Sequence, residues 1–438
     1  MSLLRRQFLS LIASSSTLAM STANADSAPS DMPHVPWSRQ AAIYEINVRQ
    51  FTAEGTLKAA TADLPRLERM GVDILWLMPI QPIGQKNRKG TLGSYYSIRD
   101  YTAVNPEFGT LADARAFVQA AHAQGMKVIL DWVANHTAFD HPWTREHEDW
   151  YKLDARGKIF PVTFNAGTPN EEHWSDVTGL SYEQPALRDA MIAAMQFWVR
   201  ETDLDGFRCD VASSVPTPFW ERARRELDAV KPMFMLAESD ARDLHRSAFD
   251  MTYGWDLARL FHEVGQGKAG APELRDWAAQ EPHGYPPSAY RMRFTANHDF
   301  NSWNGTDAEL YGDNYLPLAV LTFTLPGMPL IYGGQESRLT KRLEFFEKDP
   351  IAWKTRELQP FYTRLLALKH AHPALANGQY GGALTLLDGG NERLFAFKRA
   401  LGADSVAVVV NVSTSEQKLR LGTAERSLPA HGWLIEST

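Results

Sequence analysis

Several features are scarce in this 438-residue sequence, and each scarcity excludes a class of protein. Cys209 is the single cysteine, so no disulfide can form within the chain. The formal net charge is −7 and no run of Lys and Arg is present, which argues against a nucleic-acid-binding surface. No segment after residue 25 is long and apolar enough to span a bilayer. No Cys/His cluster or phosphate-binding loop suggests a metal centre or a nucleotide site.

Residues 1–25 have the pattern of an export signal. Arg5-Arg6 precedes an apolar run from Phe8 to Met20, and Ala23-Asn24-Ala25 fits a small-residue cleavage site. The stretch Leu4-Arg5-Arg6-Gln7-Phe8-Leu9 is typical of a twin-arginine signal, and an ordinary secretory signal, which also begins with basic residues, is the alternative. Either signal predicts a bacterial protein that is periplasmic or secreted.

From residue 41 onward, predicted strands alternate with predicted helices. A helix over Ala60–Met70 is followed by a buried strand, Val72–Pro79, and a second helix over Leu111–Gln124 ends at Gly125. After an interruption, the pattern resumes with a helix over Pro185–Arg200. Strands that alternate with helices at this spacing indicate a parallel sheet.

Four of the predicted strands end in polar side chains. They are Lys127–Asp131 before Asn135-His136, Leu204–Val211, Met233–Ala237 before Glu238, and Met292–Ala296 before Asn297-His298-Asp299. Catalytic groups at the carboxyl ends of several strands are the pattern of a (β/α)8 barrel. We therefore predict the α/β class, with a TIM barrel at the centre of the chain.

The predicted domains follow from where this alternation stops. The barrel is assigned to residues 37–136 and 179–372, and its last strand to Met328–Glu336. Residues 137–178 are rich in Trp, His, Pro, Asn and Gly with little periodicity, and are assigned to a subdomain inserted after strand 3. Short strands separated by turn residues over 373–438 predict a C-terminal antiparallel β-sandwich.

Arg208 and Asp210 lie two positions apart in a short apolar stretch that reads as a buried strand. Residues i and i+2 of a strand point to the same face, so the arginine is expected beside the carboxylate. A neighbouring positive charge lowers the pKa of an Asp and keeps it ionised, as a covalent nucleophile requires. The alternative is a structural ion pair that closes a barrel strand.

These stretches resemble the α-amylase family of glycoside hydrolases (glycoside hydrolase family 13), over most of residues 40–340. Four segments match the family's signatures in the right order. They are Asp131-Trp132-Val133-Ala134-Asn135-His136, Gly206-Phe207-Arg208-Cys209-Asp210, Leu236-Ala237-Glu238 and Asn297-His298-Asp299. The resemblance implies a retaining enzyme that cleaves α-1,4-glucosidic bonds of starch or maltodextrin.

The resemblance also implies a role for each matching residue. Asp210 would be the nucleophile, Glu238 the general acid/base, and Asp299 a group that stabilises the transition state. The residues implied in substrate binding are Tyr96, which would stack under the sugar, His136 and His298, which would bind its hydroxyls, Arg208, which would hold Asp210 charged, and Asp100, which would support the site. Asp131 is interpreted as a buried structural partner.

The residue types suit this chemistry. Retaining hydrolysis needs two carboxyl groups roughly 5 Å apart, one protonated to assist the leaving group and one ionised to attack. We expect Glu238 to lie in a drier setting than Asp210, so that the pKa of Glu238 is the higher of the two.

The sequence departs from the family pattern after the nucleophile. Many members carry Lys-His three and four residues later, where this chain has Ser213 and Ser214. Asn135 matches a calcium ligand of the family, but calcium binds six to eight oxygens and no full set can be assembled. No metal ligand is therefore assigned, and calcium stays open as a cofactor.

The signatures leave the exact activity and the oligomeric state open. An endo-acting α-glucanase is the leading reading, and neopullulanase, α-glucosidase or transglucosylase activity on maltooligosaccharides is the alternative within the class. A catalytically silent glycan-binding protein on the same barrel is a rival, which the retention of all three carboxylates disfavours.

Overall fold

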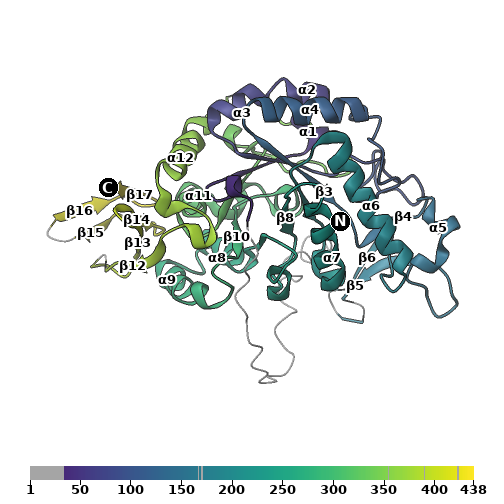
Figure 1. The fold of residues 1–438 in the computed structure, drawn as a ribbon. Helices are drawn as coiled ribbons and strands as arrows, with labels where there is room; N and C mark the ends of the chain where they lie inside the picture. Colours follow the sequence, from purple (N-terminus) through teal and green to yellow (C-terminus); the bar gives the residue numbers. More distant parts are fainter. Residues whose placement is uncertain (1–33, 166, 169–170, 354, 389, 422–423) are drawn as a thin grey trace, which may run out of the picture.

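The computed structural model describes residues 34–438 except 166, 169–170, 354, 389 and 422–423, so the predicted export signal lies outside the described residues. Its centre is a closed barrel of eight parallel strands, surrounded by helices (Figure 1). The strands are β1 (Ile43–Ile46), β2 (Ile74–Leu77), β3 (Lys127–Trp132), β7 (Gly206–Cys209), β8 (Phe234–Ala237), β9 (Met251–Tyr253), β10 (Tyr290–Arg293) and β11 (Met328–Tyr332). Around the ring their order is β1-β11-β10-β9-β8-β7-β3-β2. The predicted TIM barrel is confirmed.

Helices connect the strands and cover the outside of the barrel. They are α1 (Val48–Phe51), α2 (Leu57–Thr61), α3 (Leu64–Met70), α4 (Leu111–Ala123), α6 (Pro185–Thr202), α7 (Thr217–Asp228), α8 (Trp255–Gly265), α9 (Ala271–Gln280), α10 (Asp307–Tyr311), α11 (Tyr315–Thr324) and α12 (Gln359–Ala371). α4 begins at a capping box in which Thr110 and Asp113 bind each other's backbone N–H groups. In the part of the chain that the structure describes, no helix has the length and apolar character needed to cross a membrane.

Three local expectations differ from the structure. The helix predicted over Ala60–Met70 is two helices, because Pro65 stands in the first turn of α3. The strand predicted over Met292–Ala296 pairs from Tyr290 to Arg293. Strand β9 was not predicted because its three residues are too few to show a period.

The segment that interrupts the barrel carries a small antiparallel sheet. Its strands are β4 (His136–Ala138), β5 (Pro161–Phe164) and β6 (Glu172–Gly179), in the order β4-β6-β5, together with the short helix α5 (Trp143–Glu146). Because β4 follows β3 after three residues, this sheet begins at the carboxyl end of the barrel strands and holds His136 there. In Figure 1 it lies on the opposite side of the barrel from the C-terminal strands.

The C-terminal residues form two antiparallel sheets, which confirms the predicted change of architecture. One sheet consists of β12 (Ala383–Leu386), β13 (Leu394–Leu401), β14 (Asp404–Asn411) and β17 (Trp433–Ser437), and the other of β15 (Gln417–Leu421) and β16 (Ala424–Leu428). Side chains alternate along β13: Leu394 and Ala396 pack with the hairpin β15–β16, while Phe395 and Phe397 join the barrel core.

Arg399 of β13 joins this sheet to the barrel. Its guanidinium is buried and donates to the backbone carbonyls of Gly382, Leu325 and Ala376, the second of which ends helix α11. Because these carbonyls are buried with it, removing the guanidinium leaves acceptors without donors.

We expect Arg399→Met to lower the free energy of unfolding by about 3 kcal/mol, because it removes three buried hydrogen bonds to a charged group. Chemical denaturation measures the change. The exposed Arg420 of the same domain offers a matched control, and Arg420→Met should stay within about 0.5 kcal/mol of the wild type. Equal effects of the two substitutions would contradict this role for Arg399.

Candidate active site

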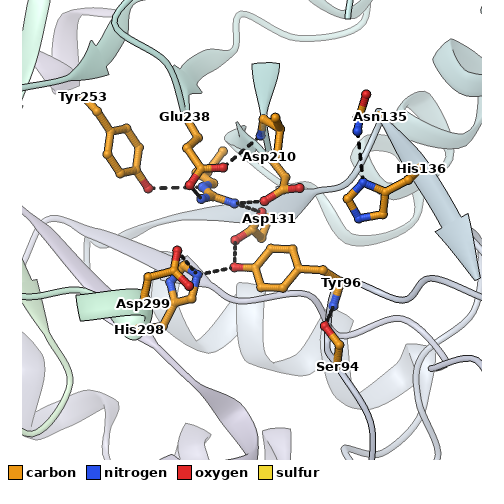
Figure 2. A network of polar contacts seen from close by, with 12 residues as sticks. Ser94, Tyr96, Asp131, Asn135, His136, Asp210, Glu238, Tyr253, His298 and Asp299 are labelled. Atoms are coloured by element: carbon orange, nitrogen blue, oxygen red, sulfur yellow. Dashed lines mark hydrogen bonds and ion pairs between the residues drawn. The ribbon is translucent and has the colours of Figure 1, made fainter. Parts of the chain in front are cut away.

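Arg208 lies at the centre of a polar cluster at the carboxyl ends of the barrel strands. Its Nη1 is 2.8 Å from Asp131 Oδ1 and 2.9 Å from Asp210 Oδ1, and its Nη2 is 3.0 Å from Glu238 Oε1. The side chain is fully buried. Figure 2 shows the carboxyl groups of Asp131, Asp210 and Glu238 converging on one point. The expected position of Arg208 beside Asp210 on one face of the strand is therefore observed.

Asp131 at the end of β3 is a buried partner, as interpreted from the sequence. Its Oδ2 accepts hydrogen bonds from Trp76 Nε1 at 3.1 Å and from the Tyr96 hydroxyl at 3.0 Å, while its Oδ1 binds Arg208. With both oxygens engaged and no exposed surface, Asp131 orients Arg208 and Tyr96 rather than facing the cleft.

Glu238 follows β8, and its carboxyl group is bound by a backbone N–H of the segment that follows β7. The Val211 N–H donates to Glu238 Oε2 at 2.8 Å. Val211 has φ +42° and ψ +46°, a left-handed conformation that is costly for a β-branched residue. This strained backbone directly follows Asp210 and turns the amide toward Glu238. The sequence carries no signal for it, since Val is a poor residue for that conformation.

A chain of hydrogen bonds extends from Asp131 to the opposite side of the barrel. The Tyr96 hydroxyl is 2.8 Å from His298 Nε2, and His298 Nδ1 is 2.5 Å from Glu45 Oε1 on β1. Since the Tyr96 hydroxyl donates to Asp131, its oxygen accepts from an N–H at His298 Nε2. Asp299 Oδ2 lies 3.3 Å from that same nitrogen.

Glu45 is a site residue that the sequence analysis missed. Burial raises the pKa of Glu45 well above its ordinary value, and burial lowers the pKa of His298. Both shifts favour a neutral pair in which the protonated Glu45 donates to His298 Nδ1. Nothing in the stretch Ile43-Tyr44-Glu45-Ile46 distinguishes this glutamate from an exposed strand residue.

His136 enters the cluster from the inserted sheet. Asn135 Nδ2 lies 3.2 Å from His136 Nδ1, and the imidazole meets Trp174 edge-on. Burial lowers the pKa of His136 to about 3, so the ring is neutral. Its Nε2 is buried and has no hydrogen-bond partner within the described residues. A hydroxyl of a bound ligand can supply that partner.

Asp100 lies apart from these residues. Its Oδ1 accepts from the backbone N–H and the hydroxyl of Thr102, a turn-capping arrangement, and it lines a separate cavity beside His141 and Trp143. No described residue of the cluster contacts it in the structure. Ser213 and Ser214 are exposed in the turn after Asp210.

The expected order of the two pKa values is wrong: the pKa of Asp210 is raised and that of Glu238 is lowered. Burial raises the pKa of Asp210 well above its ordinary value, the charge of Glu238 adds to this, and Arg208 opposes it. Burial also favours the protonated form of Glu238, but Arg208 and the Val211 N–H outweigh it and lower the pKa. Asp210 must share Nη1 of Arg208 with Asp131, whereas Glu238 has Nη2 and a backbone donor to itself.

Asn135, which matches a calcium ligand of the family, is engaged by other residues. The Asn135 carbonyl accepts from the Leu180 N–H, and its side-chain amide contacts His136. Over residues 34–438, outside the short undescribed gaps, no three His, Cys, Asp or Glu side chains are grouped to hold a metal ion. We therefore assign no calcium ligands.

Comparison with known proteins identifies the family. The solved structure of an α-amylase from Lactobacillus plantarum aligns with 92% of this chain and 99% of its own, with a TM-score of 0.81 and 30% sequence identity. The chain belongs to the α-amylase family. As a member it is a glycoside hydrolase, and the family model described as the α-amylase catalytic domain matches residues 21–233.

Two further α-amylase relatives cover most of this chain. A noncanonic maltogenic α-amylase from Thermotoga neapolitana is 28% identical, with a TM-score of 0.78 over 91% of this chain and 96% of its own. The α-amylase of Haloarcula japonica is 30% identical over 87% of this chain. The chain spans only 56% of the length of that relative.

The first prediction from this site concerns the charge of Glu45. If Glu45 is protonated in the fold, its folded pKa lies above its unfolded pKa, and stability is lost as pH rises between the two. Glu45→Gln removes this loss, so the variant should gain stability relative to wild type from pH 4 to pH 7. Denaturant titrations across that range measure the difference, with the exposed Glu392→Gln as the control.

A relative loss of stability in Glu45→Gln as pH rises would contradict the neutral pair. It would mean that Glu45 is ionised and paired with a protonated His298.

The second prediction concerns the coupling of Asp210 and Glu238. Because the charge of Glu238 contributes to the raised pKa of Asp210, Glu238→Gln should lower that pKa. Hydrolysis of an activated glycosyl fluoride needs an ionised nucleophile but little acid assistance. The acid limb of its kcat/KM profile should therefore move to lower pH in Glu238→Gln, and an unchanged or higher limb would contradict the coupling.

Proposed function

We propose that the protein is a retaining, endo-acting enzyme that cleaves α-1,4-glucosidic bonds of starch and maltodextrins. The observation that carries the proposal is the bridge formed by Arg208, which binds Asp210 through one guanidinium nitrogen and Glu238 through the other. The two carboxyl groups are therefore neighbours on one cation. Such closeness suits a nucleophile and an acid acting on one bond, and leaves little room for the water of an inverting mechanism.

The reaction proceeds in two displacements. In the first, Asp210 attacks the anomeric carbon while Glu238 gives its proton to the leaving oxygen, so that the glucosidic bond breaks and a glucosyl ester of Asp210 forms. In the second, Glu238 takes a proton from a water molecule whose oxygen attacks the same carbon and releases Asp210. The glucosidic bond is replaced by the ester bond to Asp210, and that ester bond by a bond to the oxygen of water. Two displacements at the anomeric carbon retain its configuration.

The proton must change its place when substrate binds. Burial and the charge of Glu238 raise the pKa of Asp210, whereas Arg208 and the Val211 N–H lower the pKa of Glu238. In the complex, the leaving glucosidic oxygen lies beside Glu238 and accepts a proton from it. The electrophilic anomeric carbon lies beside Asp210 and favours the ionised form of this carboxyl group. Cleavage therefore requires the shared proton on Glu238 and an ionised Asp210.

The remaining residues position the reacting sugar. Tyr96 offers a ring face, the unpartnered His136 Nε2 binds a hydroxyl of that sugar, and His298, whose Nε2 contacts the Tyr96 hydroxyl, lies beside it. Asp299, when ionised, stabilises the positive charge that develops at the sugar ring. We assign Asp100 to the support of the neighbouring turn, through its bonds to Thr102.

A second candidate is an enzyme that trims maltooligosaccharides, as a neopullulanase, α-glucosidase or transglucosylase does. It is favoured by the likeness to the maltogenic α-amylase and by Ser213 and Ser214, which stand where many members carry Lys-His. We further propose that the enzyme acts outside the cytoplasm, on the basis of Arg5-Arg6 and the apolar run after it.

We predict that Asp210→Asn abolishes turnover while the protein remains folded, because the amide is a poor nucleophile of nearly the same shape. Maltoheptaose and pullulan are the substrates, products are followed over time by chromatography, and melting curves report folding. The exposed Asp149→Asn is the matched control and should keep wild-type activity.

The products separate the two candidates. Early short and intermediate maltooligosaccharides, with pullulan largely untouched, support the endo-acting enzyme. Glucose alone indicates an exo-glucosidase, products longer than maltoheptaose a transferase, and panose a neopullulanase. An active Asp210→Asn would remove Asp210 from its role as the nucleophile.

A further inference from the structure

A cavity of about 440 Å³ lies on the flank of the barrel, between helix α6 and the inserted segment. Figure 1 shows α5 of that segment and α6 on the same side of the barrel. Residues 100–102 after β2 and residues 141–143 of the inserted segment line this flank cavity. Its remaining wall is one apolar face of α6, with the helical spacing i, i+3, i+4, i+7. The residues of that face are Ala190, Ala193, Ala194 and Phe197.

His141 brings an unpartnered donor to the flank cavity. Its side chain is buried, and its Nδ1 accepts a hydrogen bond from the Trp143 N–H at 3.1 Å. A ring nitrogen that accepts carries no proton, so the proton of the neutral imidazole lies on Nε2. Burial lowers the pKa of His141 to about 4, which keeps the ring neutral at neutral pH. The Nε2–H has no hydrogen-bond partner among the residues that the structure describes, and a ligand can supply one.

Asp100 places an acceptor near this donor. Its Oδ1 accepts from the Thr102 N–H and hydroxyl, while its Oδ2 has no partner in the described part of the chain. The charge of Asp100 opposes the lowering of the His141 pKa, because the two side chains lie close together. A carboxylate repels anions, whereas a hydroxyl group can donate to it and accept from an N–H. The pair therefore suits a neutral ligand that carries several hydroxyl groups.

Trp143 adds a flat apolar surface to the flank cavity. Its indole is half-buried, and its ring centroid lies 4.5 Å from that of His141 and 5.3 Å from that of Tyr101. Trp150 packs against it at 5.0 Å in an edge-on arrangement. These contacts hold the indole in place, and the small alanine side chains of α6 leave room beside it. A sugar ring packs its face of C–H groups on such a surface.

Tyr101 separates the flank cavity from the catalytic cluster. Its ring lines the cavity, and its hydroxyl lies within hydrogen-bond distance of two backbone carbonyls, that of Val133 at 2.7 Å and that of His136 at 3.2 Å. The cavity thus lies behind the segment that carries His136. It is a separate space and not a continuation of the cleft, since Asp210 and Glu238 do not line it.

We propose that the flank cavity is a second sugar site, which binds one end of a short maltooligosaccharide such as maltose. The identity of the sugar rests on the proposed function. The terminal glucosyl ring packs on Trp143, accepts a hydrogen bond from the Nε2–H of His141, and donates one to Asp100. The volume lies within the range of small-molecule pockets and suits one or two sugar rings.

The test follows two tryptophan signals by fluorine NMR in the full chain labelled with 5-fluorotryptophan. Trp143 reports the flank cavity, and Trp174, which meets His136 edge-on, reports the catalytic cluster. Trp143→Phe and Trp174→Phe assign the two signals, and Asp210→Asn prevents turnover. Maltose is the probe. We expect maltose to shift both signals, each with its own dissociation constant.

Variants that close the cavity make the test specific. Ala193→Phe, at an exposed position of α6, should weaken the binding reported by Trp143 at least roughly tenfold and leave the response of Trp174 unchanged. Ala186→Phe, at an exposed position of the same helix outside the cavity, is the matched control and should change neither response. His141→Asn keeps an acceptor for the Trp143 N–H but removes the Nε2–H, so it should also weaken binding at Trp143 alone.

A Trp143 signal that maltose does not shift overturns the second sugar site. So does a response at Trp143 that folded Ala193→Phe and His141→Asn both leave unchanged, because that response would be transmitted from the catalytic cluster. A response at Trp174 in the same titration leaves the proposed function standing in either case. If neither signal responds and the wild type leaves maltoheptaose intact, the proposed function fails and the second site with it.

Discussion

The site depends on a single buried cation among carboxyl groups. A buried guanidinium is stable only when carboxylates balance its charge and acceptors bind its N–H groups. Removing the arginine leaves the neighbouring carboxylates buried without a counter-ion. Arg208 meets Asp131, Asp210 and Glu238 from strands β3, β7 and β8, so three neighbouring strands are held in register by one side chain. Gly206 permits this closeness, because a Cβ there would lie 1.9 Å from the Phe234 carbonyl.

The hydrogen-bond network continues beyond Arg208. In each of its bonds, one group must donate a proton and the other must accept it. Asp131 accepts from Tyr96, Tyr96 accepts from His298, and His298 contacts Glu45 on strand β1. The donor and acceptor roles in one bond determine those in the next. The contact of Glu45 with Nδ1 of His298 therefore fixes the proton of the ring on Nε2. A site whose donors are oriented before substrate binds spends little free energy on reorganisation during the reaction. The buried Nε2 of His136 is available on the same rim.

The sequence was informative where the physics is local. Apolar runs of strand length that end in Asp131, Asp210, Glu238 and Asp299 predicted both the barrel and the rim that carries the site. It was uninformative where a conformation depends on distant contacts. The left-handed Val211, the buried Glu45 and the sheet made by β4, β5 and β6 have no local signature. The order of the Asp210 and Glu238 pKa values also depends on which nitrogen of the Arg208 guanidinium each of the three carboxyl groups contacts. The spacing of these residues along the chain does not determine those contacts.

The most direct test of the account is to trap the covalent intermediate. A 5-fluoro-α-glucosyl fluoride forms the glycosyl ester quickly and releases it slowly, so the ester accumulates on the nucleophile. Mass spectrometry of proteolytic peptides then locates the added sugar. A single ester on Asp210 is expected. An ester on Glu238 or Asp299, or steady turnover with no ester on any residue, would contradict it.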